Sequence, residues 1–205
     1  MSSLCLHISA AKSLRSTLGV CSVAKSHAGT PNAGIAKFKF QKRKTHRLRL
    51  INAGAEGIQR FTIDGHTMTV MANDFVPVKP YTTSVVTLGI GQRTDVIVKA
   101  NMPSNSAVWM RSDISTNCSL TNQPHALAAI YYDKADTTQK PNTTATAYSD
   151  THCGNDPLTS TVPFFPFPAT RNPDTTQKID ITFGQNASGN FVWFMNGESF
   201  RANYE

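Results

Sequence analysis

Residues 45–51 read THRLRLI, so polar and apolar side chains alternate along the run. An alternation of period two predicts a strand with one buried and one solvated face. Similar short apolar or alternating runs lie at residues 37–40, 59–63, 67–72, 83–90, 94–100, 107–111 and 126–132. Gly, Pro and Asn fill the gaps, and no window after residue 30 keeps a helical period. We therefore expect an all-β fold, a Greek-key sandwich or barrel.

Two short turns set the expected pairing of these strands. Asp64-Gly65 separates residues 59–63 from 67–72 and predicts a tight hairpin, because both turn positions favour positive φ. Gly91-Gln92 separates 83–90 from 94–100 and predicts a second antiparallel pair. Beyond a Thr/Asn-rich excursion at 133–160, residues 178–183 and 191–195 predict a new pair around Asn186–Asn190. The chain therefore begins an incomplete second β unit at its C-terminus.

The positive charge is confined to the first quarter of the chain. Residues 1–55 hold ten Lys/Arg and no acidic residue, whereas the remaining residues are net negative. The formal net charge of the full chain is +7. A nucleic-acid-binding domain needs a basic face on its folded body, so we expect no nucleic-acid partner. The densest run, KFKFQKRK at 37–44, is interpreted as an edge strand with Lys in water rather than a phosphate-binding patch. No apolar run is long enough to span a bilayer, so we expect no membrane partner.

Cysteine spacing and glycosylation motifs suggest the cellular compartment. The four cysteines never form a C-x-x-C pair, which excludes a zinc knuckle and a thioredoxin motif. Three N-x-S/T motifs begin at Asn117, Asn142 and Asn186, and we take these as candidate glycosylation sites of a secreted glycoprotein. Residues 1–36 contain no recognisable signal peptide. They resemble either a transit peptide or, as we favour, a segment foreign to the ancestral fold.

The order of several motifs resembles one known family. These are RLRLIN at 47–52, FTIDGH at 61–66, DFVPV at 74–78, GQRTDVIV at 91–98, PHALAAI at 124–130 and FVWFMNG at 191–197. Together they resemble the middle, plastocyanin-like cupredoxin domain of fungal laccase-type multicopper oxidases, followed by the start of the third domain. The likeness covers residues 37–205. One departure is Thr94, where the family usually has an aromatic residue.

The resemblance implies four segments. Residues 1–36 are a basic, non-resembling segment that we expect to be disordered, and residues 37–160 are the middle cupredoxin-like domain. Residues 161–175 are a Pro/Phe-rich linker, because VPFFPFP at 162–168 suits an extended chain packed between domains better than a ligand of an aromatic groove. Residues 176–205 are a truncated start of the third cupredoxin domain.

Laccases are secreted copper enzymes that oxidise phenols by one electron and reduce dioxygen to water. The resemblance implies that their copper ligands lie in the first and third domains, the partners missing here. The six histidines of this chain form no H-x-H pair, and Gly154 follows His152-Cys153 where a second histidine would be needed. We therefore expect no bound metal or cofactor, no catalytic residue in this chain alone and no activity alone, which leaves its status as an enzyme open. The alternative is a non-catalytic cupredoxin-like module that binds a partner.

Individual residues take expectations from the same resemblance. Glu56 matches a carboxylate at the mouth of the phenol pocket, where it would accept the proton that a phenol loses on oxidation. Cys118 and Cys153 match a disulfide within the middle domain, whereas Cys5 and Cys21 have no matching partner. From the residues alone, His66 is expected to be a surface or turn residue and Trp193 a core residue.

Overall fold

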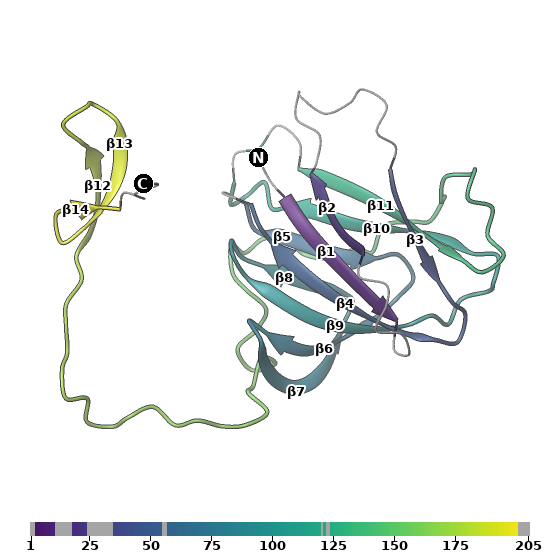
Figure 1. Ribbon diagram of the computed structural model, residues 1–205, viewed down its shortest axis with the longest axis horizontal. Coiled ribbons are helices and arrows are strands. Elements are labelled where there is room, and N and C mark those ends of the chain that lie inside the picture. The colour runs from purple at the N-terminus through teal and green to yellow at the C-terminus, as the bar shows by residue number, and fades with distance from the viewer. Residues whose placement is uncertain are drawn as a thin grey trace. The chain divides into compact units, whose positions relative to one another are not determined.

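The computed structural model describes residues 3–10, 18–23, 35–54, 57–119, 121 and 124–200, the first two ranges by their backbone (Figure 1). The chain divides into two compact units between Pro166 and Phe167. All regular elements of the described residues are strands: β1 (Ser3–Ala10), β2 (Leu18–Val23), β3 (Ala36–Phe40), β4 (Thr45–Asn52), β5 (Gln59–Ile63), β6 (Met68–Asn73), β7 (Val76–Thr83), β8 (Val85–Leu88), β9 (Arg93–Lys99), β10 (Ala107–Ile114), β11 (His125–Tyr132), β12 (Ile181–Gln185), β13 (Phe191–Met195) and β14 (Glu198–Ser199). This part of the chain contains no helix that could cross a membrane.

Two sheets form the first unit. One has the order β2-β1-β4-β9-β6-β7 and the other β3-β11-β10-β5-β8 (Figure 1). Every pairing is antiparallel except that of β3 with β11. The all-β expectation is therefore confirmed, with chain connections that cross between the sheets.

The core lies between the inner faces of the two sheets. Along β4 the alternation predicted for residues 45–51 is present, because Leu48 and Leu50 are fully buried while Arg47 and Arg49 are exposed. The second sheet contributes Phe61, Ile63, Ile130 and Tyr132, each no more than 1% exposed. Alternate side chains from facing sheets interdigitate in this way in β-sandwiches, and their burial supplies the main stabilising free energy.

The two predicted hairpins are wrong. The Asp64-Gly65 turn does exist, but it carries the chain from β5 in one sheet to β6 in the other. Likewise β8 pairs with β5, whereas β9 pairs with β4 and β6. A two-residue turn signal specifies a local reversal of the chain. It does not specify whether the next strand stays in the same sheet.

Two strands lie in the described ranges 3–10 and 18–23 of the N-terminal segment. β1 and β2 pair with each other, and β1 extends the first sheet beside β4. The sequence SLCLHISA of β1 alternates Leu4, Leu6 and Ile8 with small or polar residues, a pattern that favours a strand.

Segment 162–164 closes the free edge of β7. Lys79 N donates to the Val162 carbonyl and Phe164 N to the Pro77 carbonyl, each at 2.8 Å. An unpaired edge strand is a template for aggregation, so this short pairing protects the sheet. The predicted linker thus begins as an extra strand-like segment on the first unit.

The second unit is a small three-stranded sheet, β12-β13-β14. β12 and β13 pair antiparallel around Asn186–Asn190, as the sequence predicted. Trp193 is 64% exposed, so the expectation that it lies in a core is wrong for this unit. Its ring instead lies 4.9 Å from that of Phe183 on an open face of the hairpin.

His66 is buried rather than exposed. Its Nε2 lies 2.6 Å from the Tyr132 hydroxyl and its Nδ1 2.9 Å from the Asp64 carbonyl. His46 stacks on Phe40 with ring centroids 4.2 Å apart. Burial lowers the pKa of both histidines below the ordinary value of 6.5. The period-two pattern alone could not show these side-chain partners.

Candidate functional site

The residue expected to meet substrate, Glu56, lies outside the described residues together with Ala55. Residues 53–54 and 57–58, which precede and follow this pair, are described; the stretch 53–58 connects β4 to β5 and is here called the Glu56 loop. The contacts at its two ends fix the backbone on either side of residues 55–56.

Asn52 holds both ends of the Glu56 loop. Its side chain is fully buried. Asn52 Nδ2 donates to the carbonyls of Gly57 at 2.9 Å and Leu88 at 3.1 Å, and its Oδ1 accepts from Gly54 N at 3.1 Å. The amide therefore joins the residue two before Glu56 to the residue directly after it, and fixes both to β8.

Gly57 is the second fixed point. Its φ is +102°, and a Cβ built there would lie 3.1 Å from Ile114 Cγ2. Only glycine adopts this backbone without strain, and a Cβ here would press on the Ile114 side chain of β10. Ser115 N also donates to the Ile58 carbonyl at 3.1 Å. Gly57 and Ile58, at the C-terminal end of the loop, thus pack directly on the end of β10.

A disulfide lies at the same end of β10. Cys118 and Cys153 are bonded, with Cα atoms 5.4 Å apart and a sequence separation of 35, which is the pair that the family resemblance implied. Nearby, Asn117 Nδ2 donates to the Asp150 carbonyl at 2.6 Å. The loop after β10 is therefore tied to the Thr/Asn-rich excursion.

Arg60 reinforces this tie from β5. It is 7% exposed, and its guanidinium donates to Thr87 Oγ1 at 2.5 Å and to the His152 carbonyl at 2.6 Å, while Nε lies 3.3 Å from Asp150 Oδ1. A buried guanidinium needs such partners, because an unpaired buried charge is costly. The excursion supplies most of them, so it is part of the folded unit.

The excursion is anchored a second time at Asp64. Arg111 makes a two-pronged contact with the Asp64 carboxylate, both distances 2.8 Å, and Thr143 Oγ1 donates to it at 2.6 Å. Hydrogen bonding to Asp64 raises the pKa of Arg111. The turn that sequence analysis took for a hairpin signal therefore also supplies the anchoring carboxylate.

One acid–imidazole pair lies beside the disulfide-bonded loop. His125 Nδ1 is 2.8 Å from Asp113 Oδ1, and Tyr148 donates to Asp113 Oδ2 at 3.1 Å. Burial, followed by the negative charge of Asp113, raises the pKa of Tyr148. The sequence gives no sign of this group, because its members are far apart in the chain.

The described residues do not fit a copper centre. No three His, Cys, Asp or Glu side chains among them come close enough to share a metal ion. Cys118 and Cys153 offer no thiolate because they are bonded to each other. His46 and His66 lie within the core, and His125 is paired with Asp113. A blue copper site requires two imidazoles and a thiolate.

The multicopper oxidase family model matches residues 19–135, which is more than half of the chain. This chain belongs to the multicopper oxidase family. It is 35% identical over 181 residues to Laccase-1 of Botryotinia fuckeliana, covering 86% of this chain and 31% of that laccase. It is 44% identical over 131 residues to Oxidoreductase OpS5 of Beauveria bassiana, covering 62% of this chain and 22% of the relative.

Solved multicopper oxidases share its fold. The laccase from Botrytis aclada superposes with a TM-score of 0.71 at 34% identity, covering 83% of this chain and 31% of that structure. Fet3p, a multicopper oxidase that functions in iron import, gives a TM-score of 0.66 at 19% identity and supports the fold alone. The cupredoxin-like architecture is therefore confirmed. The chain spans less than a third of the length of these relatives.

Proposed function

We propose that this chain forms the middle domain of a laccase-type multicopper oxidase, together with the beginning of the third domain. Its contribution to phenol oxidation is the Glu56 carboxylate rather than a copper ligand. The observation that supports this most is the Asn52 clamp, because a buried amide with three hydrogen bonds holds the residues flanking Glu56. Catalytic side chains on loops need such fixed supports.

The chemistry assigned to Glu56 is proton acceptance. A phenol that loses one electron becomes a strong acid, so the O–H proton must leave with the electron. The proton passes to the Glu56 carboxylate, the electron passes to the acceptor site of the whole oxidase, and a neutral phenoxyl radical remains. A positioned carboxylate base accelerates such a step by roughly 10²–10⁴-fold.

The oxidase reaction as a whole requires the other cupredoxin domains. In the whole enzyme, copper supplies electron transfer from phenol to dioxygen, and its ligands come from the first and third domains. The proposal therefore includes those two domains as partners, phenolic molecules as substrates, and no phenol oxidation by this chain alone. It also includes secretion and N-glycosylation, which the sequence motif at Asn142 supports because that asparagine is exposed.

The open face of the second unit supports the proposed domain partner. Ile181, Phe183, Phe191, Trp193 and Met195 are each more than half exposed, and strand register places them on one face of the β12–β13 hairpin. An aromatic face of this kind normally packs on further structure. The rest of a third domain is the covering that the family relationship suggests.

Copper loading of the purified chain tests the proposal. We expect no stoichiometric copper, no thiolate-to-copper absorbance band and no phenol oxidation. The same residues 37–160, substituted into Laccase-1 of Botryotinia fuckeliana, should support phenol oxidation. A blue band or phenol turnover by the chain alone would contradict the assignment. A correctly folded, copper-loaded chimera without phenol turnover would instead favour the non-catalytic binding module.

A further inference from the structure

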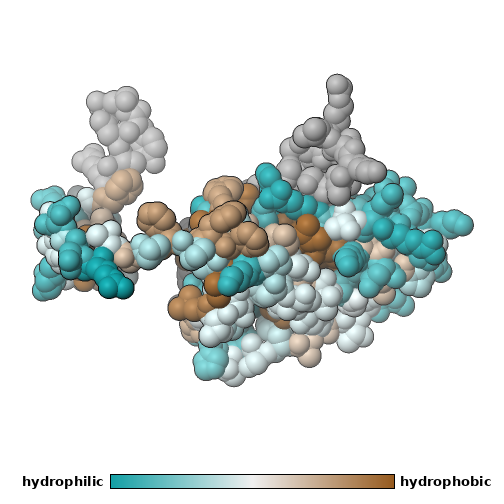
Figure 2. Space-filling model, turned by 90° about the horizontal axis from the view of Figure 1, so that it is seen from below, coloured by the Kyte–Doolittle hydropathy of each residue, from teal (hydrophilic) through white to brown (hydrophobic). Residues whose placement is uncertain are grey.

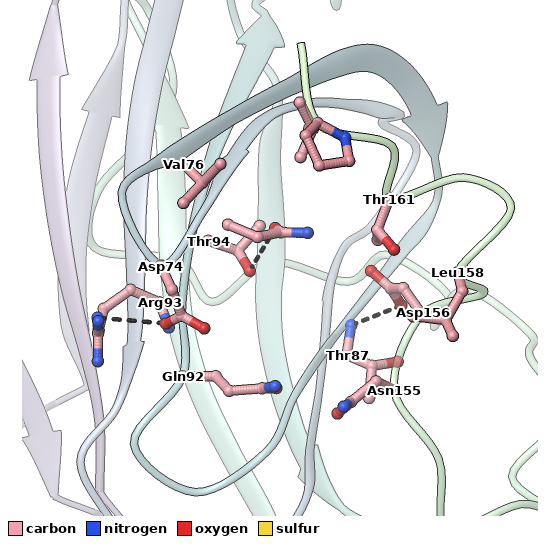
Figure 3. A pocket seen from close by; sticks show the side chains of 13 residues that line it. Asp74, Val76, Thr87, Gln92, Arg93, Thr94, Asn155, Asp156, Leu158 and Thr161 are labelled. Atoms are coloured by element: carbon pink, nitrogen blue, oxygen red, sulfur yellow. Dashed lines mark hydrogen bonds and ion pairs between the residues drawn. The ribbon is translucent and has the colours of Figure 1, made fainter. Parts of the chain in front are cut away.

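A cavity of about 380 Å³ lies within the first unit, away from the Glu56 loop. It is bounded by the β6–β7 turn, the start of β9 and the segment 155–163 (Figure 3). Its volume is in the range of small-molecule sites. Four of its thirteen lining residues are apolar and nine are polar or charged. An occupant that uses the whole lining therefore needs both apolar surface and hydrogen-bonding groups.

Several polar side chains of the inner wall are hydrogen-bonded to other residues of the protein. Thr94 Oγ1 donates to Asn73 Oδ1 at 3.2 Å, and Asp156 accepts from Thr87 N and from the Tyr81 hydroxyl, each at 3.1 Å. Figure 3 shows the hydrogen bond between Thr87 and Asp156 as a dashed line, with Thr94 on another strand of the lining. These hydrogen bonds hold the inner wall in place and do not involve the Gln92 and Asn155 side chains nearer the mouth.

Two amides near the mouth retain unused hydrogen-bonding capacity. Gln92 Oε1 accepts from Gly89 N at 2.6 Å, and no described residue accepts from Gln92 Nε2. Within the same described part of the chain, the exposed Asn155 side chain makes no hydrogen bond. A Cβ added to Gly89 would lie 3.0 Å from Gln92 Oε1 and 3.4 Å from Asn155 Oδ1, so both amides approach the same glycine.

Arg93 and Asp74 place opposite charges in the cavity lining, and the ion pair between them leaves Arg93 Nε without a hydrogen bond among the described residues. Arg93 Nε is buried and lies 3.3 Å from Asp74 Oδ1, but it has no hydrogen-bond partner of good geometry among the described residues. Asp74 Oδ1 also accepts from Arg93 N at 2.9 Å. With Asp156 included, carboxylates outnumber guanidinium groups, so a phosphate or another anion is disfavoured.

We propose that this cavity binds a neutral saccharide. Each sugar hydroxyl is both donor and acceptor, so one ring can accept from Gln92 Nε2 while it donates to Asn155 Oδ1 or to the Asp74 carboxylate. The C–H faces of the ring have apolar surface to contact at Val76 and Pro163. Neither the copper chemistry of the family nor Glu56 takes part in this binding.

The test is a titration of the ¹⁵N-labelled full chain with cellobiose, followed by two-dimensional NMR. We expect saturable shifts confined to the cavity lining. Asn155→Ala and Gln92→Glu should each raise the Kd about fivefold, the equivalent of one lost hydrogen bond. Gln92→Glu keeps the oxygen that accepts from Gly89 N. The exposed Asn101→Ala, outside the cavity lining, is the matched control and should leave the Kd unchanged.

Three results would overturn the proposal. The first is the absence of saturable shifts at the cavity with cellobiose. The second is equal binding by folded Asn155→Ala, Gln92→Glu and control chains. The third is a response of the same signals to catechol or inorganic phosphate but not to cellobiose, which would identify a phenol or an anion site. Spectra of each variant without ligand show whether it has folded.

Discussion

Replacing Asn52 by alanine should strongly destabilise the first unit, because its amide bonds three backbone groups at once. Gly57 O and Leu88 O lose their donor, and Gly54 N loses its acceptor. A buried polar group left without a partner costs about 1–3 kcal/mol. Water can reach part of the loop after truncation, so we expect the free energy of unfolding to fall by about 3–5 kcal/mol.

Urea unfolding of the full chain measures this loss. Far-ultraviolet circular dichroism follows the sheets, and Trp109 fluorescence follows the first unit in a Trp193→Phe background. Asn101→Ala is the control, since Asn101 is exposed and should change stability by no more than about 0.5 kcal/mol. Asn52→Asp keeps the acceptor for Gly54 N but turns a carboxylate towards two carbonyls, so its loss should be at least as large. A loss below about 1 kcal/mol for Asn52→Ala would refute the clamp.

Three further changes test other parts of the fold. Replacing Cys118 and Cys153 together by serine should cost about 3–4 kcal/mol for their 35-residue separation, measured by urea unfolding; an unchanged midpoint would show that the excursion needs no cross-link. Gly57→Ala should cost roughly 1–3 kcal/mol through its positive φ and the contact with Ile114, and a neutral effect in thermal unfolding would contradict this strain. Burial lowers the pKa values of His46 and His66, so as the pH falls below the unfolded value of 6.5 the unfolded chain binds more protons than the folded chain, and the folded state loses stability. His66→Gln should therefore weaken the dependence of Tm on acid pH. A pH profile of Tm identical to that of the unsubstituted chain would contradict this account.

The sequence predicted strands well and their partners poorly. β5 was predicted with its full bounds, and β4 to within one residue, because turn residues and alternation mark them locally. Pairing depends on contacts distant in sequence, so Asp64-Gly65 was taken for a hairpin although it links two sheets. β7 was missed because Pro77 and Pro80 argue against a strand, yet it is an edge strand, where proline is tolerated.

Only part of the candidate site could be predicted from the sequence. The cysteine pair came from family resemblance, and the structure shows it bonded. Asn52 beside Ala53-Gly54 resembles an ordinary turn residue, and nothing in the sequence shows that its amide reaches Leu88. Figure 2 shows apolar side chains on the surface of the larger unit, and Phe75 is 77% exposed.

The central claim is that Glu56 accepts the proton of a phenol in a whole oxidase. Its most direct test replaces the middle domain of Laccase-1 of Botryotinia fuckeliana by residues 37–160 of this chain, either unchanged or carrying Glu56→Gln. We compare oxidation of a phenol with oxidation of ferrocyanide, which gives up an electron and no proton. Glu56→Gln should slow phenol oxidation about a hundredfold and leave ferrocyanide oxidation unchanged. Unchanged rates for both substrates, or an equal loss for both, would contradict the account.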